Sequence, residues 1–322
     1  MQALGNLLRA GKEWSWVSSD ASAAAAGVPY PYPGFANYAF MALAPFPRVA
    51  ETYGPIYHVG SPLGTQSYHA LQLTANKRMS KGIAANAAYT YSRSRSNVDS
   101  GFQESWGVGL LQDVTKLDAE AEVIDANDMT RVVKGFVTWE LPFGKGRRYL
   151  DRSGPVDALL GGWQLSVIFK HLSGTPMAIT SSASYTGWST YGYPIYVNAD
   201  PTGNFANQFN ADSFNIAKPG DAGNRYFDPR AFSNPAYGEF GKGPRFFEQL
   251  RTFSRTYADL GLLKTFRVVG RSRAQIRFEL INIFNMKYFS NPVNAIANPN
   301  FGNVISLTGE PRQGQIGLRF EW

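Results

Sequence analysis

The sequence predicts an all-β fold, an antiparallel transmembrane β-barrel segment of about seven strands that is open as an isolated chain. Three observations support this class. Several segments alternate apolar and polar residues, short turns alternate with long loops between them, and the last segment ends on an aromatic residue, Trp322. We therefore expect a cell outer membrane protein of a Gram-negative organism, with outer-membrane lipid as a partner.

Composition is compatible with this class. The mean hydropathy of the 322 residues is −0.25, and no stretch approaches the roughly 18 apolar residues that a spanning helix needs. A barrel places only every second residue in lipid, so its average stays polar. The chain has no cysteine, which excludes disulfides and thiolate metal sites.

The net charge of +7 raises the possibility of nucleic-acid binding. The basic residues are spread along the chain, and the densest cluster, Lys145, Arg147 and Arg148, lies in a Gly-rich turn. No basic stripe or known binding module accompanies the charge, so we expect no nucleic-acid partner.

Two regions are expected. Residues 1–67 are rich in Pro and Gly and predict an irregular extracellular loop with a short helix near Leu4–Leu8. Residues 68–322 predict the barrel strands. At the N-terminus the apolar residues precede Arg9, the reverse of the order in a signal peptide, so we expect the beginning of an exported protein to be missing.

Alternation begins at Tyr68 and recurs to the end of the chain. Between 273 and 284, for example, the apolar Ile276 and Phe278 alternate with the charged Arg277 and Glu279. One face of such a strand needs water or polar partners, and the other needs hydrocarbon or a second layer. The expected strands are 68–79, 83–95, 129–142, 162–173, 256–267, 273–284 and 313–322.

The alternation assigns each strand a face. Arg277, Glu279 and Arg319 should point inside, whereas Val132 and Phe136 are apolar residues in the polar phase of their strand. One continuous apolar band is expected from Leu71, Leu73, Val137, Leu165, Leu260, Leu262, Ile276, Phe278 and Leu318.

Loop lengths set the topology. Turns 80–82 and 268–272 are short, and loops 96–128, 175–254 and 286–311 are long. Short periplasmic turns and long extracellular loops are the outer-membrane arrangement, and with the last strand running toward the periplasm all three long loops fall outside. Aromatic residues should mark both rims, with Trp139, Phe143, Trp163, Phe320 and Trp322 at the periplasmic rim and Tyr89, Tyr91 and Tyr257 at the outer rim.

The last eight residues are similar to the terminal signal that the outer-membrane barrel-assembly machinery reads. Its fixed positions are a polar residue, a Gly, an aromatic or apolar residue and a terminal aromatic residue. Gln315, Gly317, Phe320 and Trp322 occupy them in order. The resemblance implies that this machinery is a partner.

Further motifs resemble the Oar-like branch of TonB-dependent receptors, from about residue 25 to the end. The resemblance implies a barrel of about 22 strands around an N-terminal plug, often preceded by a carboxypeptidase regulatory-like domain, with ligand binding and uptake across the outer membrane driven through TonB. The chain lacks the TonB box, the plug and the earlier strands, so TonB would act only through the missing N-terminal part. The motifs are Tyr68–Leu73, Lys77–Gly82, Tyr89–Ser92, Leu141–Gly146, Gly161–Trp163, Ser173–Pro176, Arg277–Glu279, Asn282–Asn285 and Pro311–Gln313.

No motif for catalysis, cofactor or metal binding is complete. The segments around Lys145 and Lys242 lack the Ser or Thr and the earlier Gly of a phosphate loop. An acidic run from Asp113 to Asp128 lacks the Gly and Glu of a calcium-binding EF-hand, which favours a solvated loop. The three histidines are far apart. We expect no enzyme, no cofactor and no metal, and the ligand-binding residues stay unknown.

Two other functions remain open. The first is a structural or adhesion-related barrel without transport. The second is a soluble secreted carbohydrate-binding β-protein that uses the Tyr- and Trp-rich loop 181–196, against which the apolar stripes argue. Fold does not fix the ligand. Seven strands also leave free edges at 68–79 and 312–322, so we expect the isolated chain not to be a stable unit.

Overall fold

The computed structural model describes residues 2–44, 46–53, 64–97, 123–185, 195–237, 239, 241–267 and 272–322. Most of the acidic run, most of loop 181–196 and turn 268–271 lie outside these residues. None of the described helices is both long enough and apolar enough to cross a bilayer.

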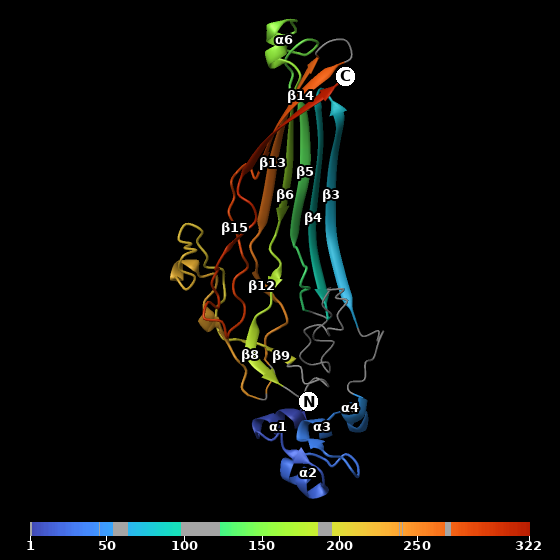
Figure 1. Ribbon diagram of the computed structural model, residues 1–322, viewed down its shortest axis with the longest axis vertical. Helices are drawn as coiled ribbons and strands as arrows, with labels where there is room; N and C mark the ends of the chain where they lie inside the picture. The colour runs from blue at the N-terminus through green and yellow to red at the C-terminus, as the bar shows by residue number, and fades with distance from the viewer. Residues whose placement is uncertain are drawn as a thin grey trace.

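A seven-stranded antiparallel sheet dominates the molecule (Figure 1). Its strands follow one another in chain order, and each pairs with its neighbours among the seven. Among the described strands, the edge strands β3 and β17 each have one partner, so the sheet is open as predicted. All seven expected strands are confirmed, with ends shifted by a few residues at most. They are β3 Gln66–Ser80, β4 Ile83–Ser96, β5 Arg131–Glu140, β6 Trp163–Leu172, β13 Arg255–Arg267, β14 Arg273–Ile281 and β17 Gln313–Glu321.

The register confirms the predicted faces. Residues paired across an antiparallel sheet point to the same side. One row of pairs therefore runs from Val137 through Val167, Leu260 and Leu280, entirely on the apolar face. The nine residues of the predicted band all belong to this face. Arg277, Glu279 and Arg319 lie on the polar face, where Glu279 pairs with Gln315.

Tyr257 lies at the end predicted for the outer rim, but it does not face lipid as a residue of an aromatic belt would. Its register partner is Lys170, which in turn pairs with Lys134, so Tyr257 lies on the polar face and not beside Tyr91 on the apolar face. The reason is its phase in β13, where it matches Asp259. As expected, Phe136 is an exposed apolar side chain on the polar face.

The two ends of the sheet differ (Figure 1). At the turn end lie the Lys81–Gly82 turn, helix α6 (Pro155–Leu160) between β5 and β6, and the C-terminus. At the loop end the described parts of the long connections gather, together with the N-terminal segment. The predicted parity of strands, turns and terminus is confirmed.

The N-terminal segment is more regular than predicted. Besides the expected helix, its described residues form three more helices and a two-stranded sheet, because apolar residues there share a core that includes Leu8, Val17 and Phe35. The extracellular location of residues 1–67 stays a prediction. The elements are α1 Gln2–Arg9, β1 Trp16–Val17, α2 Asp20–Ala26, β2 Asn37–Tyr38, α3 Ala39–Ala42 and α4 Pro47–Tyr53.

Residues 175–254, expected to be a long loop, form most of a folded unit that we name the loop lobe, and Phe289 and Phe301 from the connection between β14 and β17 complete its core. Phenylalanines form its core, and Phe227 is fully buried between Phe232 and Phe301. Its elements are β7 Pro176–Met177, β8 Thr180–Tyr185, β9 Ile195–Asn198, β10 Asp200–Pro201, η2 Ala222–Asn224, η3 Pro229–Ala231, β11 Phe232–Ser233 and β12 Phe247–Arg251.

The connection from β14 to β17 begins with a fixed turn. Asn282 and Asn285 both have the left-handed backbone conformation, with φ of 55° and 50°, which Asn tolerates better than most residues. The Asn282 side chain donates to the carbonyls of Met286 and Glu310 and accepts from the Met286 amide. The short strands β15 Tyr288–Phe289 and β16 Leu307–Thr308 follow and pair with each other.

Candidate functional site

Basic and tyrosine side chains gather on the polar face at the loop end. Lys134, Lys170 and Tyr257 come from three adjacent strands at matching register positions. The Lys170 ammonium lies 5.8 Å from the centre of the Tyr257 ring, and Tyr288 stacks on that ring at 5.2 Å between centroids. The sheet therefore presents a continuous row of cations and phenol rings.

Arg255 and Lys287 extend this row, and we name the six residues Lys134, Lys170, Arg255, Tyr257, Lys287 and Tyr288 the basic–tyrosine rim. Arg255, Lys287 and Tyr288 line a pocket of about 250 Å³ whose other walls include Phe253 and Phe289. The pocket thus has cations on one side and aromatic surface on the other.

Tyr288 is held in place and kept protonated. Its hydroxyl donates to the Thr256 carbonyl at 2.5 Å. Burial raises the pKa of Tyr288, and the neighbouring Tyr257 and Asp259 raise it further, against the opposing charge of Arg255. The neutral hydroxyl therefore persists at neutral pH.

Below the rim, toward the middle of the sheet, the polar face carries an apolar hollow. Phe136 and Ile168 are register partners in β5 and β6, and both are exposed. They line a hollow of about 480 Å³ together with Lys134, Lys170 and Asn86. An apolar floor flanked by cations suits a ligand that combines negative charge with apolar surface.

The rim has more cations than acidic partners in the part of the chain that the structure describes. Among the described residues, no carboxylate forms an ion pair with Lys134, Lys170, Arg255 or Lys287. Asp259, an acidic residue on the same face and in the same strand as Tyr257, accepts from the Asn282 amide at 2.9 Å. The site therefore carries net positive charge that attracts anions.

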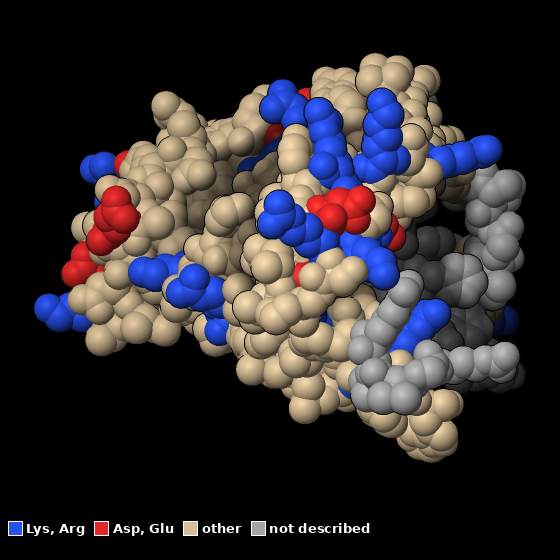
Figure 2. All heavy atoms as spheres, turned by 90° about the horizontal axis from the view of Figure 1, so that it is seen from above, with Lys and Arg blue, Asp and Glu red and all other residues tan. Residues whose placement is uncertain are grey.

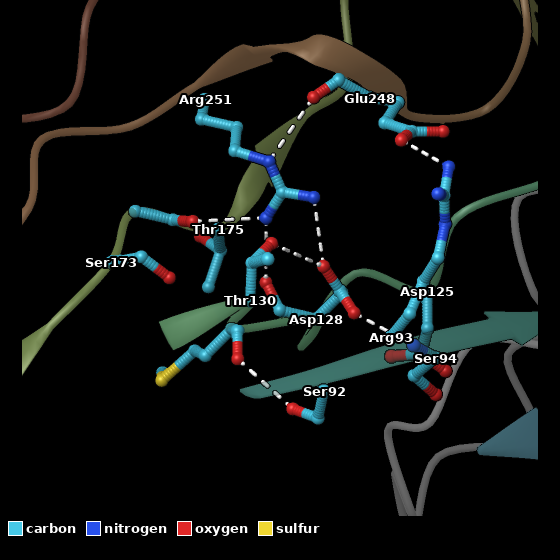
Figure 3. A network of polar contacts seen from close by, with 12 residues as sticks. Ser92, Arg93, Ser94, Asp125, Asp128, Thr130, Ser173, Thr175, Glu248 and Arg251 are labelled. Carbon is cyan, nitrogen blue, oxygen red and sulfur yellow. Dashed lines mark hydrogen bonds and ion pairs between the residues drawn. The ribbon is translucent and has the colours of Figure 1, made fainter. Parts of the chain in front are cut away.

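A network of polar contacts, which we name the latch, fixes the loop lobe to the sheet (Figure 3). Arg251 from β12 forms an ion pair of 2.7 Å with Asp128 and donates to the backbone carbonyls of Asp128 and Gly174. The Asp128 carboxylate also accepts from the Ser94 amide in β4 at 2.7 Å. The Asp128 side chain is 1% exposed, so this pair is a buried one.

Other contacts surround the latch at the same end. Arg93 forms an exposed ion pair with Glu248, and the buried Arg245 donates to the Ser96 carbonyl. A side chain at Gly174 would collide with the Thr252 carbonyl, since a Cβ there would lie 1.8 Å from that oxygen. The Ser173–Pro176 motif therefore has a structural role in seating the lobe.

Tyr226 anchors the core of the lobe to β12. Its hydroxyl donates to the Arg251 carbonyl, and burial raises the pKa of Tyr226 to about 12. At the surface of the lobe, hydrogen bonds from Arg230 lower the pKa of Asp228 to about 2.

Replacing Arg251 by Met is expected to release the loop lobe. The change leaves the buried Asp128 carboxylate without its cation, and breaking such a pair costs roughly 3–5 kcal/mol. Limited proteolysis should then cut the lobe faster, while the sheet stays resistant. The matched control is Glu248→Gln, because an exposed pair contributes about 1 kcal/mol or less. Equal cleavage of both variants would contradict the role of the latch.

Three residues of the predicted assembly signal lie on the edge strand β17, away from the rim, and Trp322 follows directly after the end of that strand. Gln315 donates to Glu279 on the polar face. Phe320 and Trp322 lie at the turn end, where their rings stack at 6.1 Å, and Trp322 is 92% exposed. Gly317 is the register partner of Arg277. Recognition of this strand by a partner stays a prediction.

Sequence reasoning did not identify the basic–tyrosine rim. The signal available was the phase of Lys134 and Lys170, which both occupy polar-face positions close to the loop ends of their strands. The contribution of Lys287 and Tyr288 depends on the path of a connection and has no periodic signal. Among the described residues no group of three or more His, Asp or Glu side chains is arranged to hold a metal ion.

Comparison with known proteins bears on the fold. Residues 16–315 match the family described as outer membrane beta barrel domain. Among solved structures, the outer membrane transporter YddB from Escherichia coli is similar at 9% identity and a TM-score of 0.36, over 80% of this chain and 25% of that one. FpvAI in its complex with pyocin S2 is similar at 8% identity and a TM-score of 0.31, over 79% and 19%. The chain thus spans a quarter or less of these proteins. No curated protein matches it.

Proposed function

The chain belongs to the outer membrane β-barrel domain family, and on that premise we propose that it forms the C-terminal wall of a TonB-dependent receptor. It lies in the outer membrane of a Gram-negative cell, with its apolar face toward lipid and its polar face toward the barrel interior. The receptor binds an anionic ligand at the basic–tyrosine rim and passes it along the inner face.

The open sheet supports the idea that other strands complete the barrel. The free edges of β3 and β17 carry backbone donors and acceptors that hydrocarbon cannot satisfy, at a cost of several kcal/mol for each group. Closure therefore requires partners for both edges. The motifs shared with Oar-like receptors, including Asn282–Asn285 and Gly161–Trp163, favour a large receptor barrel over a small pore.

The basic–tyrosine rim is the observation that carries the proposal. It lies on the inward face at the end where the long connections gather, which is the outer end of the barrel in the proposed orientation. Four cations that form no ion pair with a carboxylate among the described residues attract negative charge, and the rings of Tyr257 and Tyr288 offer flat apolar surface. We infer that the protein binds the ligand and lets it pass, without converting it chemically.

Uptake of labelled probes by cells tests this function. Cells that carry the complete receptor are given one of two anionic probes, a hexapeptide of Glu or iron-labelled ferric citrate. A hexapeptide of Lys serves as the control probe of opposite charge. We expect at least one anionic probe to be bound at the surface and to accumulate in the periplasm only when TonB is present. The variant Lys170→Gln with Lys287→Gln should weaken binding about tenfold or more, since each cation contributes on the order of 1 kcal/mol.

The matched control is Lys77→Gln with Lys81→Gln, which removes the same charge at the turn end. It should bind the anionic probe as the unchanged receptor does. Surface binding without TonB-dependent accumulation would favour the adhesion function. Equal binding of the acidic and basic hexapeptides would contradict the proposed ligand class.

A further inference from the structure

The connection between β5 and β6 forms a folded foot at the turn end, which we define as residues 143–163. It contains α6 and exposes several large apolar side chains. Leu159 is 70% exposed, and it is accompanied by Leu160, Val156, Leu150 and Tyr149. Apolar surface that a protein leaves uncovered in a fixed structure indicates a binding surface.

Internal contacts hold the foot in one shape. Asp157 accepts from the Lys145 amide at 2.7 Å, and Asp151 accepts from the Gly146 amide at 2.6 Å. The two halves of the foot approach each other so closely that a Cβ at Gly144 would lie 2.5 Å from both Gly161 and Asp157. The exposed leucines therefore sit on a built element.

Lys264 shows which side of the barrel the foot occupies. Its register partners are Trp163 and Ile276, so it belongs to the apolar, lipid-facing side of the sheet. Even so, its side chain is 2% exposed. The ammonium donates to the carbonyls of Leu159 and Gly161 at the end of α6 and lies 5.4 Å from the Trp163 ring centre.

This contact joins the foot to the lipid-facing band. A lysine stem lies along apolar surface while its charge is satisfied by the last carbonyls of a helix. Trp163 adds a second link, since its indole donates to the Leu159 carbonyl at 2.8 Å. The apolar band thus continues from the sheet onto α6 at the periplasmic rim.

The foot also carries the densest basic cluster of the sequence. Arg147 pairs with Glu140 at 2.8 Å, whereas Lys145, Arg148 and Arg152 are exposed and form no ion pair among the described residues. Figure 2 looks onto this end of the molecule, where Lys and Arg side chains cover more of the described surface than Asp and Glu. Cations beside exposed leucines match the boundary of an anionic lipid layer.

We propose that the foot is a membrane anchor that lies in the periplasmic leaflet and binds the headgroups of anionic phospholipids. Leu159 and Leu160 enter the acyl boundary, while Lys145, Arg148 and Arg152 contact phosphate groups. The continuity with the lipid-facing band favours lipid over a periplasmic protein as the occupant. Of the proposed function, the anchor requires only the position in the outer membrane. The result for ligand uptake therefore does not decide whether the foot binds lipid.

A site-specific fluorophore tests the insertion of the foot. This chain has no cysteine, so Leu159→Cys introduces a unique label site once any cysteine elsewhere in the complete barrel is changed to serine. The matched control is Ile216→Cys in the loop lobe, where the side chain is similarly exposed at 56%. In phosphatidylethanolamine–phosphatidylglycerol vesicles, brominated lipid should quench the label at 159 and aqueous iodide the label at 216. Iodide quenching at 159 equal to that at 216 would overturn the proposal.

Lipid selectivity tests the headgroup contact. By native mass spectrometry, the complete barrel in mild detergent should retain phosphatidylglycerol in preference to phosphatidylcholine, and free glycerol phosphate should not compete. Lys145→Gln with Arg148→Gln should reduce that preference about tenfold or more, at about 1 kcal/mol per cation. Lys218→Gln with Lys242→Gln, at the other end, should leave it unchanged. Equal loss in both variants, or none in either, would contradict a headgroup site in the foot.

Discussion

Arginine in place of Val167 is expected to prevent the barrel from accumulating in the outer membrane. Val167 lies in the middle of β6, the fourth of the seven strands, between Val137 and Leu260 on the lipid-facing side. A charged side chain near the bilayer midplane destabilises a transmembrane barrel by roughly 2–4 kcal/mol. The measurement is the amount of heat-modifiable barrel in isolated outer membranes.

The neighbouring position supplies the control. Ser166 follows the polar face, where its register partners are Thr138 and Gly261. Ser166→Arg adds the same charge to the same strand but directs it into the water-filled side, so the barrel should assemble at close to its usual level. If Ser166→Arg were the damaging change and Val167→Arg the tolerated one, the assignment of the two faces would be reversed.

Serine at both Phe320 and Trp322 is expected to abolish assembly of the complete barrel while export to the periplasm continues. The two rings stack at the turn end of β17, whose outer edge has no strand partner among the residues that the structure describes. An edge strand that offers free backbone groups together with alternate side chains is suited to recognition by strand addition. The measurement is the protein level in outer-membrane and periplasmic fractions.

Two residues on the polar face of β17 supply the matched control variant. Arg319 and Glu321 form an exposed ion pair of 2.8 Å on the polar face. Replacing both by serine changes the same number of residues at the same end of the chain. The loss of an exposed ion pair should destabilise the barrel by about 1 kcal/mol or less. Normal outer-membrane levels of the Phe320 and Trp322 variant, or equal loss in both variants, would remove the case for an assembly signal.

The sheet was predictable from sequence because its two faces meet different environments. Arg277 and Phe278 are adjacent in the chain but face opposite sides, and the same alternation predominates in the seven strands, with exceptions such as Phe136 on the polar face. The same reasoning contained the signal that corrects Tyr257. It has the phase of Asp259, so its ring belongs inside even though tyrosine is common at membrane rims.

The loop lobe was not predictable in the same way. Its core joins Phe209, Phe253 and Phe289, which are far apart in the sequence and lie 4.8 to 5.4 Å from one another between ring centroids. Such packing depends on how an irregular segment folds back on itself, so the sequence contains no repeating pattern that predicts it. The basic–tyrosine rim has the same limit, since Tyr288 reaches Tyr257 only through the turn that Asn282 fixes.

The pairing of Leu172 with Arg255 has a consequence for how this protein can evolve. These residues are direct register partners, although 82 residues separate them in the chain, so the intervening segment leaves the wall and rejoins it at one point. Closing a longer or shorter segment there changes the free energy slowly, by about 0.6 kcal/mol for each doubling of length. Insertions, deletions and whole-segment exchange between related genes are therefore compatible with an unaltered wall. Surface antigens and ligand preferences can diversify at this junction while the strands stay constant.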